Sequence, residues 1–292
     1  MRIVRVTAPL LAVDAPSMLF RAFHALPDSI TGTDGRPVNA LLGAANLVLR
    51  EAEAHRPRAV ALCFGPDAAA YRVELYPAYH AARPGVPAAL EPQLADAPAF
   101  FGAFAWTVAV HGSLEADDLL GSFARVEAEA GGRALVLTGD RDMFQCASDA
   151  VTVLYVRTGS RGAEEVGPAG VRRRYGVDPE QVPDFIALRG DPSDGIPGAA
   201  GIGEKTAAEL LRRHGSLEAV LAAAIREPRA RVRASLLSAA DELRAFKDIA
   251  TLRDAGIERP PDRVTDRQAA AAAARARGMN RLADRLSAQP GG

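Results

Sequence analysis

Cysteine is nearly absent from this chain: only Cys63 and Cys146 occur among its 292 residues. Each lies in or just after an apolar run, which favours buried free thiols in a reducing compartment over a disulfide. The sequence also has no apolar stretch near the ~18 residues of a membrane span, and Asp14 interrupts its apolar start. No membrane helix or targeting signal is therefore predicted, and we expect a cytoplasmic protein.

Net charge is also nearly absent, because 35 Lys and Arg stand against 36 Asp and Glu, a formal charge of -1. Any binding of nucleic acid must then come from a local cluster of basic residues. Hydrophobic residues make up 48% of the chain, enough for a proper core. The length suits one large domain, or a domain joined to a smaller helical one.

Eight acidic residues that belong to no charge run are the most informative feature of the sequence. They end apolar stretches or lie in glycine-marked turns, where any one of them alone could be a helix cap or turn former. Carboxylates that converged on one cleft would repel one another unless divalent cations neutralised them. Oxygen ligands suit hard cations, so we predict a site for two or more Mg²⁺ or Mn²⁺ ions. The eight acids are Asp14, Glu115, Asp117, Asp118, Asp140, Asp142, Asp191 and Asp194.

Short apolar runs alternate with helical patterns up to about residue 160. Buried strands separated by amphipathic helices imply an α/β fold, with a mostly parallel central sheet covered by helices on both faces. Ligands of such a sheet collect outside the carboxyl ends of its strands, and acids end or follow three of the expected strands. The expected strands are 10–13, 59–64, 106–110, 134–138 and 151–156, with helices at 41–55 and 114–130.

From about Gly167 the β-rich runs thin out, and helix start and stop signals such as Pro168 and Gly176 take over. We therefore divide the chain into an α/β core of residues 1–166 and a smaller all-helical region of residues 167–292. The alanine-rich end of the second region is expected to be a solvated, packed helix.

A glycine-rich turn at 198–206 feeds a helix that Gly215 ends. Exposed backbone N–H groups at such a helix start form an anion site suited to one phosphodiester. A P-loop is excluded because Glu204 separates the last glycine from the lysine, and a dinucleotide fingerprint would need a further glycine. We predict a helix-hairpin-helix type clasp on a nucleic-acid backbone, with a plain helix-turn-helix packing corner as the alternative. The candidate contacts are Gly201, Gly203, Lys205 and Thr206.

Four sequence motifs that contain the eight acids and the glycine-rich turn occur in an order that resembles the structure-specific 5′-nucleases. This family includes flap endonucleases and the 5′-3′ exonuclease domains of bacterial repair polymerases. The resemblance covers nearly the whole chain, through L-L-A-V-D-A-P-S-M-L-F-R-A-F-H-A-L-P, E-A-D-D, T-G-D-R-D-M-F-Q and G-D-P-S-D-G-I-P-G-A-A-G-I-G-E-K-T-A. It implies a PIN-like nuclease core in which the eight acids bind the divalent ions. It also implies that the clasp holds duplex DNA, often with K⁺ on its backbone carbonyls.

The implied reaction is hydrolysis of a phosphodiester in DNA that carries a 5′ flap, a 5′ overhang or a nick, in primer removal and repair. Two ions roughly 4 Å apart can activate a water, neutralise the phosphate and stabilise the departing 3′-oxygen. Asp14, Glu115, Asp117 and Asp140 are the expected inner ligands, and the other four acids act further out or through water. On the expected helix, Glu115 and Asp118 are three residues apart and should share a face. We expect a monomer.

The segment 71–84 matches the start of the helical gateway of this family, which we expect near 71–105. By the resemblance, Arg72 and Arg83 touch the reacting phosphate as catalytic residues, because a guanidinium can hold a phosphate in two directions. Tyr79 could stack on a base. The alternative is that these arginines are solvated on an amphipathic helix.

His80 stands where the family usually has a lysine. A histidine with an unperturbed pKa of about 6.5 is mostly neutral at cellular pH, so we expect slower cleavage than in relatives that keep the lysine. His80→Lys should raise the single-turnover cleavage rate at pH 8, and an unchanged rate would argue against a catalytic role at this position. The aspartate usual after the second strand is replaced by Gly65, with Asp67 two places on.

Three other classes of protein are weighed against this interpretation. A DNA-binding protein with weak or lost catalysis would be free to drop acids, yet all eight are present. Phosphoaspartyl phosphotransfer would need an acid two places after Asp14, where Pro16 stands. A metal-dependent ribonuclease of the same core fold would not need the helical half with its clasp, and it is the main alternative.

Overall fold

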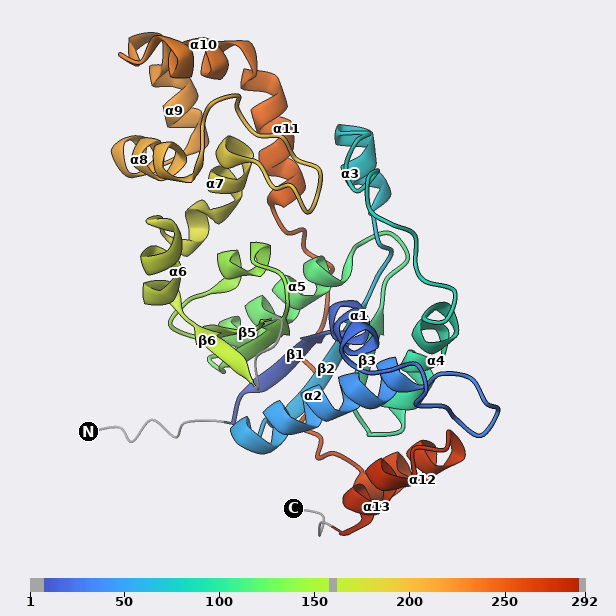
Figure 1. Cartoon of the computed structure of the whole chain (residues 1–292). Helices are drawn as coiled ribbons and strands as arrows, with labels where there is room; N and C mark the ends of the chain where they lie inside the picture. Colours follow the sequence, from blue (N-terminus) through green and yellow to red (C-terminus); the bar gives the residue numbers. More distant parts are fainter. Residues whose placement is uncertain (1–7, 158–161, 289–292) are drawn as a thin grey trace, which may run out of the picture.

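The computed structural model describes residues 8–157 and 162–288. Its centre is a six-stranded sheet in the order β3-β2-β1-β4-β5-β6 (Figure 1). The first five strands are parallel, and β6 pairs with β5 in the antiparallel direction. The predicted α/β fold with a mostly parallel sheet is confirmed, although β6 was not predicted. The strands are β1 (Leu10–Asp14), β2 (Ala59–Phe64), β3 (Thr107–Val110), β4 (Ala134–Thr138), β5 (Val151–Val156) and β6 (Ala163–Val166).

Helices cover both faces of the sheet. Leu10 and Ala12 of β1 pack into one hydrophobic cluster, whereas Leu11 and Val13 pack into the other, because successive side chains of a strand point to opposite faces. The first cluster lies under α5 (Ala116–Glu129) and the η1 turn (Asp142–Cys146), and the second under α1 (Ala15–Ala25), α2 (Asn39–His55) and α4 (Glu91–Gly102). Burial on both faces is why the central strands read as unbroken apolar runs.

The expected helical gateway is only partly helical. It contains α3 (Ala70–Leu75) and α4, but residues 76–90 between them form turns and irregular backbone. Three prolines in this stretch, at 77, 84 and 87, cannot donate a backbone hydrogen bond, which disfavours a continuous helix. The prediction of a helical gateway over 71–105 is therefore corrected to two short helices with an irregular connection that carries His80 and Arg83.

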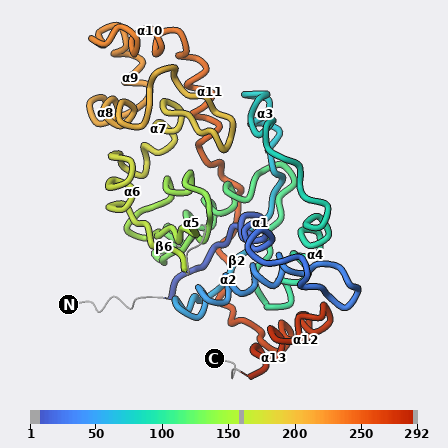
Figure 2. The backbone as a smooth tube through the Cα atoms, viewed as in Figure 1, coloured from blue at the N-terminus to red at the C-terminus, as the bar shows by residue number. Residues whose placement is uncertain are grey.

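The helical part that follows β6 stands over the carboxyl end of the sheet (Figures 1 and 2). It shares one continuous hydrophobic cluster with the α5 face, in which Phe185 of α7 stacks on Tyr175 of α6 with ring centroids 4.9 Å apart. Gly176 and Gly190, with φ of 70° and 85°, end α6 and α7 as predicted. The elements are α6 (Pro168–Tyr175), η2 (Pro179–Gln181), α7 (Val182–Arg189), α8 (Glu204–His214), α9 (Leu217–Ala223), η3 (Ala224–Arg226), α10 (Ala230–Ser238) and α11 (Ala240–Ala250).

The last two helices return to the α/β core. Helices α12 (Arg267–Ala276) and α13 (Asn280–Ala288) lie at the end of the molecule opposite α8 to α11 (Figure 1), and their buried residues join the cluster under α2 and α4. Arg277 donates to Asp96 of α4. The residues after 250 therefore do not belong to one separate helical body with α6 to α11, and the boundary between residues 166 and 167 stays a prediction. No helix in the described ranges is long and apolar enough to cross a membrane. Cys63 and Cys146 are free thiols.

A buried carboxylate of α5 binds the segment that joins α11 to α12. Glu127 of α5 is fully buried and accepts hydrogen bonds from Arg259 (Nε to Oε2, 2.9 Å) and from Arg58 (Nε to Oε1, 3.0 Å). Nη1 of Arg58 also donates to the carbonyl of Pro260 at 2.7 Å. Burial opposes ionisation, but the hydrogen bonds from Arg58 and Arg259 outweigh it and hold the pKa of Glu127 below its ordinary value.

Glu127→Gln should lower the free energy of unfolding by about 3 kcal/mol at pH 7, because it removes the buried carboxylate that the guanidinium groups of Arg58 and Arg259 share. A depressed carboxyl pKa supplies stability that is present above the unfolded pKa and lost as pH falls through the folded pKa. The difference from wild type should thus shrink below about pH 4.5, the ordinary glutamate value. Urea unfolding between pH 3 and 8 measures it, with the exposed Glu129→Gln as control. A loss of unfolding free energy that is equal at every pH would contradict the ion pairs of Glu127 with Arg58 and Arg259.

Candidate metal centre

The acids gather at the point where the strand order of the sheet reverses. From β1 the chain continues through β2 and β3 on one side and then returns to β4 on the other side. Asp14 is the last residue of β1, and Asp140 follows β4. The hydroxyl of Thr138 donates to Oδ2 of Asp14 at 2.8 Å and accepts from the backbone N–H of Asp140 at 2.9 Å. Crevices at such a switch point are the usual ligand sites of open α/β sheets.

A pocket of about 1310 Å³ opens at this edge, and five of the eight predicted acids line it. They come from the end of β1, the start of α5, the turn after β4 and the loop before α8, so that segments far apart in sequence meet as expected. All four acids that were expected to be inner ligands are among them. The five acids are Asp14, Glu115, Asp117, Asp140 and Asp194.

Burial opposes ionisation of several carboxyl groups in and beside this pocket. Burial, followed by the charges of Asp14 and Asp140, raises the pKa of Asp117 well above its ordinary value. Burial and the charge of Asp194 raise the pKa of Asp140 to about 6, and burial with Asp140 raises that of Asp142. Burial is the first cause of each shift, and the repulsion between acids that the sequence led us to expect adds to it. Bound cations would remove that repulsion.

The donor set fits hard cations. The pocket acids offer only oxygen ligands, which suit Mg²⁺ and Mn²⁺. Within residues 8–157 and 162–288, no three acidic, histidine or cysteine side chains stand close enough to enclose one ion. Because Mg²⁺ keeps several of its waters and needs only one or two direct carboxylates, a cleft with separated acids can hold it partly through water.

Asp118 does not face the pocket. Glu115 is the N-cap of α5 rather than a residue of its first turn, and its backbone N–H donates to Oδ2 of Asp118 at 3.1 Å in a capping box. Asp118 is fully buried, and its Oδ1 accepts from Nη2 of Arg72 at 2.9 Å and from the backbone N–H of Arg253 at 2.8 Å. Asp118 is therefore a structural hydrogen-bond acceptor, which corrects the prediction that it binds a metal.

The loop that carries Asp191 and Asp194 is shaped by two glycines. Gly190 and Gly198 have φ of 85° and 68°, and a Cβ on Gly198 would stand 2.3 Å from the backbone nitrogen of Gly190. Asp191 accepts from the backbone N–H of Ser193 at 2.8 Å and from Arg189 at 3.2 Å, and it does not line the pocket. Asp142 does not line it either. For both residues, a role as outer ligand stays a prediction.

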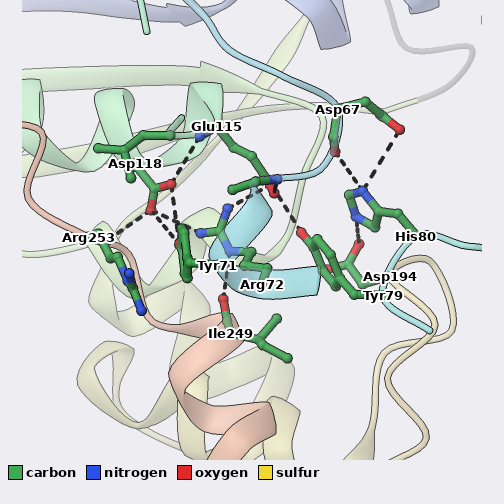
Figure 3. Close-up of polar contacts among 12 residues, drawn as sticks. Asp67, Tyr71, Arg72, Tyr79, His80, Glu115, Asp118, Asp194, Ile249 and Arg253 are labelled. Carbon is green, nitrogen blue, oxygen red and sulfur yellow. Dashed lines mark hydrogen bonds and ion pairs between the residues drawn. The ribbon is translucent and has the colours of Figure 1, made fainter. Parts of the chain in front are cut away.

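Arg72 is buried and cannot touch a substrate phosphate. Its side chain is only 3% exposed, and Figure 3 shows it between Glu115, Asp118 and the end of α11. Nε donates to the carbonyl of Ile249 at 3.0 Å, Nη2 to Asp118 at 2.9 Å, and Nη1 lies 2.7 Å from Oε2 of Glu115. A phosphate contact and a solvated arginine are both wrong for this residue, because the guanidinium is buried against two carboxylates and a carbonyl of the protein.

Tyr79 is likewise unavailable for stacking on a base. It is 5% exposed, and its ring stacks on that of His80 with centroids 3.8 Å apart. Its hydroxyl donates to Oε2 of Glu115 at 3.0 Å, while the backbone N–H of Ala69 donates to Oε1 at 2.6 Å. The prediction of base stacking is therefore corrected, and Tyr79 instead orients the carboxylate of Glu115.

His80 and Arg83 both face Asp194. Nε2 of His80 lies 3.3 Å from Oδ1 of Asp194, and Nδ1 donates to the carbonyl of Asp67 at 2.6 Å. Arg83, with a third of its side chain exposed, donates from Nη2 to the same oxygen at 2.8 Å. Burial opposes ionisation of Asp194, but His80 and Arg83 outweigh it and lower its pKa. The catalytic roles of His80 and Arg83 stay predictions.

The glycine-rich clasp has the expected local form. Gly201 has φ of 77°, Gly203 is the N-cap of α8, and Gly215 ends that helix. A Cβ on Gly201 or Gly203 would meet no atom within 4 Å, so this surface is open to the approach of a ligand backbone. Lys205 is exposed and Thr206 is half-buried in the first turn. Contact with DNA, and K⁺ on the carbonyls, stay predictions.

The sequence interpretation missed two residues that support the pocket acids. The buried Thr138 joins Asp14 to Asp140, and Arg21, which lines the pocket, donates to the carbonyl of Gly139 at 2.9 Å. Burial raises the pKa of Asp14, and the nearby Arg21 is one of the groups that oppose this rise. Spacing alone gave no signal for Arg21, because Asp14 is the N-cap of α1 and helical periodicity begins only after it.

Fold and pocket together define an α/β protein with an acid-lined cleft at the switch point of a mostly parallel sheet, followed by a helical part. The chain belongs to the 5′-3′ exonuclease family: residues 9–176 match its N-terminal resolvase-like domain and residues 177–270 match its C-terminal SAM fold.

Curated relatives are similar to about three quarters of this chain. The 5′-3′ exonuclease of Mycobacterium tuberculosis (strain H37Rv) is 40% identical over 237 residues, which cover 74% of each chain. The 5′-3′ exonuclease of Streptomyces coelicolor is 39% identical over 76% of this chain and 77% of its own. DNA polymerase I of Mycobacterium bovis is 38% identical over 74% of this chain, but the match spans only 24% of the polymerase, about a quarter of its length.

Solved structures share the fold at lower identity. The zinc-bound T5 5′-exonuclease superposes with a TM-score of 0.70 at 18% identity, over 96% of this chain and 97% of its own. The catalytic core of Rad2 in complex with a DNA substrate gives a TM-score of 0.64 at 12% identity, over 99% of this chain and 94% of its own.

Proposed function

We propose that this protein is a divalent-metal-dependent 5′-nuclease that hydrolyses phosphodiester bonds of DNA at or near 5′ ends and at junctions of single strand and duplex. The observation that carries the proposal is the convergence of five acids in one pocket, where burial raises the carboxyl pKa values of Asp14, Asp117 and Asp140 and the charges of neighbouring acids add to the rise for Asp117 and Asp140. Membership in the 5′-3′ exonuclease family supports the same activity.

The side chains of this pocket can be assigned distinct tasks. Asp14, Asp117 and Asp140, with Glu115 beside them, would hold the divalent ions. When bound, two such ions activate a water and neutralise charge on the scissile phosphate and the departing oxygen. Arg83 is the one predicted arginine at the pocket that is partly exposed, and its guanidinium can donate to phosphate oxygens once it leaves Asp194 or Asp67.

The helical part would bind the duplex beside the cleft. The open turn at Gly201 and Gly203, with the exposed Lys205, offers backbone N–H groups and a positive charge to a phosphodiester. The acid loop at 190–198 leads directly into this turn, so that the clasp and the metal ligand Asp194 belong to one stretch of chain. We further propose that the substrates are DNA flaps, overhangs and nicks that arise in primer removal and repair, and that the protein acts as a monomer.

A metal-dependent ribonuclease of the same core fold is the second candidate. It is disfavoured because the helical part is built into the main hydrophobic cluster, with Leu210 and Leu211 of α8 buried together with core residues. A DNA-binding protein with weak catalysis is disfavoured by the five acids in the pocket.

Cleavage of a 5′-flap DNA duplex, a nicked duplex and single-stranded RNA of the same sequence distinguishes these candidates. The assay is run with Mg²⁺, with Mn²⁺ and with EDTA. We expect cutting of the flap substrate near its junction with either metal, and no cutting in EDTA. Cutting in EDTA would refute the metal centre, a preference for RNA would favour the ribonuclease, and binding without cutting in either metal would favour the DNA-binding protein.

A further inference from the structure

One buried guanidinium contacts both a pocket acid and the C-terminal end of α11. Arg72 of α3 contacts Glu115, Asp118 and the carbonyl of Ile249, which lies in the last turn of α11 (Figure 3). These partners come from two segments that are distant in sequence: Glu115 and Asp118 at the start of α5, and Ile249 in α11. Glu115 is the only one of the three that lines the pocket.

The carboxylate of Glu115 is held from several sides. Its Oε1 accepts from the backbone of Ala69, and its Oε2 accepts from Tyr79 and forms the ion pair with Arg72. With Glu115 only 6% exposed and Arg72 3% exposed, neither charge can turn to bulk water. The carboxylate therefore has one orientation that satisfies its donors, and Arg72 supplies the only positive charge among them.

The end of α11 and the residues that follow it contact Asp118 and the residues around Arg72. The backbone N–H of Arg253 donates to Asp118, and the Arg253 guanidinium lies over the ring of Tyr71 at 3.4 Å from its centroid. Tyr76 packs edge-on against Phe246 of α11 with centroids 5.1 Å apart. Residues of α3 and its neighbours thus meet α11 and the start of the following segment through polar and aromatic contacts together.

We propose that Arg72 is a positioning residue: it fixes the carboxylate of Glu115 for metal binding and makes that position depend on the docking of the end of α11. The inference rests on the proposed metal-dependent nuclease function and concerns how the metal site is assembled. No contact of Arg72 with substrate is part of it.

Only arginine can make these contacts at once. Its planar fork presents Nε toward Ile249 while the two terminal nitrogens reach Glu115 and Asp118. A lysine keeps the positive charge but concentrates it in one ammonium group, which cannot bridge three acceptors in this geometry. Arg72→Lys therefore separates the positioning of Glu115 from simple charge compensation.

The test compares Arg72→Lys with Arg125→Lys, an exposed arginine of α5 that pairs with Glu129 and Asp254 away from the pocket. Binding of Mn²⁺ alone, without DNA, is titrated by electron paramagnetic resonance at 15 °C, where near-ultraviolet circular dichroism verifies the fold. Arg72→Lys should weaken Mn²⁺ binding about 10- to 100-fold, the size typical of losing a partner that orients a ligand. Arg125→Lys should bind as wild type does. A folded Arg72→Lys with wild-type affinity would overturn the proposal.

A second measurement on the wild-type protein decides the matter if the lysine variant does not fold. The Nε–H resonance of Arg72 is followed by nitrogen NMR during titration with Mg²⁺ and compared with that of Arg58, which is buried against Glu127 far from the pocket. We expect the Arg72 signal to shift and the Arg58 signal to stay. An Arg72 signal that ignores bound Mg²⁺ would refute the link to Glu115. If wild type bound neither Mn²⁺ nor Mg²⁺, the proposed function would fail together with this inference.

Discussion

Asp140→Asn should lower the rate of phosphodiester hydrolysis by at least about 10³-fold while it stabilises the metal-free protein. Asp140 belongs to the proposed metal site. Thr138 connects it to Asp14 through two hydrogen bonds, and the charge of Asp194 helps to raise its pKa. An ion at such a site contributes several kcal/mol to the transition state, and each ~1.4 kcal/mol corresponds to a tenfold change in rate. Single-turnover cleavage of a 5′-flap duplex at saturating Mg²⁺ measures the loss.

The gain in stability has a separate cause. In EDTA the buried acids repel one another, so removal of one charge should raise the melting temperature by about 2–4 °C for each kcal/mol of relieved repulsion. Saturating Mg²⁺ should make the melting temperature of wild type the higher of the two, because wild type is stabilised more by binding the ions than the variant is. Asp149→Asn, an exposed residue outside the pocket, should change neither quantity. A variant that cuts at the wild-type rate, or melts lower in EDTA, would refute the assignment of Asp140.

Gly65→Asp, which restores the residue usual in the family, should destabilise this protein instead of improving it. A Cβ on Gly65 would stand 2.4 Å from the carbonyl oxygen of Leu114 and 2.8 Å from the backbone nitrogen of Ala116. Both atoms belong to the backbone around Glu115, which cannot step aside as a flexible side chain could. We expect a loss of about 3 kcal/mol in the free energy of unfolding, the upper range for overpacking, and at least a tenfold loss of cleavage because Glu115 is displaced.

Gly112→Asp is the matched control for this prediction. It makes the same change in the connection between β3 and α5, where a Cβ would meet no atom within 4 Å. Its stability should stay within about 0.5 kcal/mol of wild type, as is usual for exposed substitutions. Chemical denaturation and the flap assay measure both variants. A folded Gly65→Asp with raised activity would mean that the turn at Glu115 yields and that the family aspartate is compatible with this chain.

Much of the fold could be predicted from local patterns. Five of the six strands, the helices α2 and α5, and the glycine stops of the helical part followed from apolar periodicity and from turn residues. The strand β6 could not be predicted in this way, because Ala163–Val166 contains two glutamates and no apolar run. The placement of α12 and α13 on the core was also beyond these patterns, since an amphipathic helix does not specify which surface it covers.

The candidate site was predictable down to its segments but not down to its individual side chains. Glu115 and Asp118 were expected to share a helical face. Glu115, however, has φ and ψ of -74° and 165° as the N-cap, so helical periodicity begins only after it. The capping box then turns Asp118 toward Arg72 and away from the cleft. The polar partners that decide such orientations come from α3 and α11, which are distant in sequence.

The sequence by itself determined that the acids would meet: apolar strands that end in aspartate, arranged in a parallel sheet, deliver their carboxylates to one edge whatever the details of packing. Only the tertiary structure decided which of the neighbouring polar groups serve that edge. Arg72, Tyr79 and Asp118 are drawn inside because a buried charge or hydroxyl needs a partner, and the available partners are set by segments that come together only when the chain is folded.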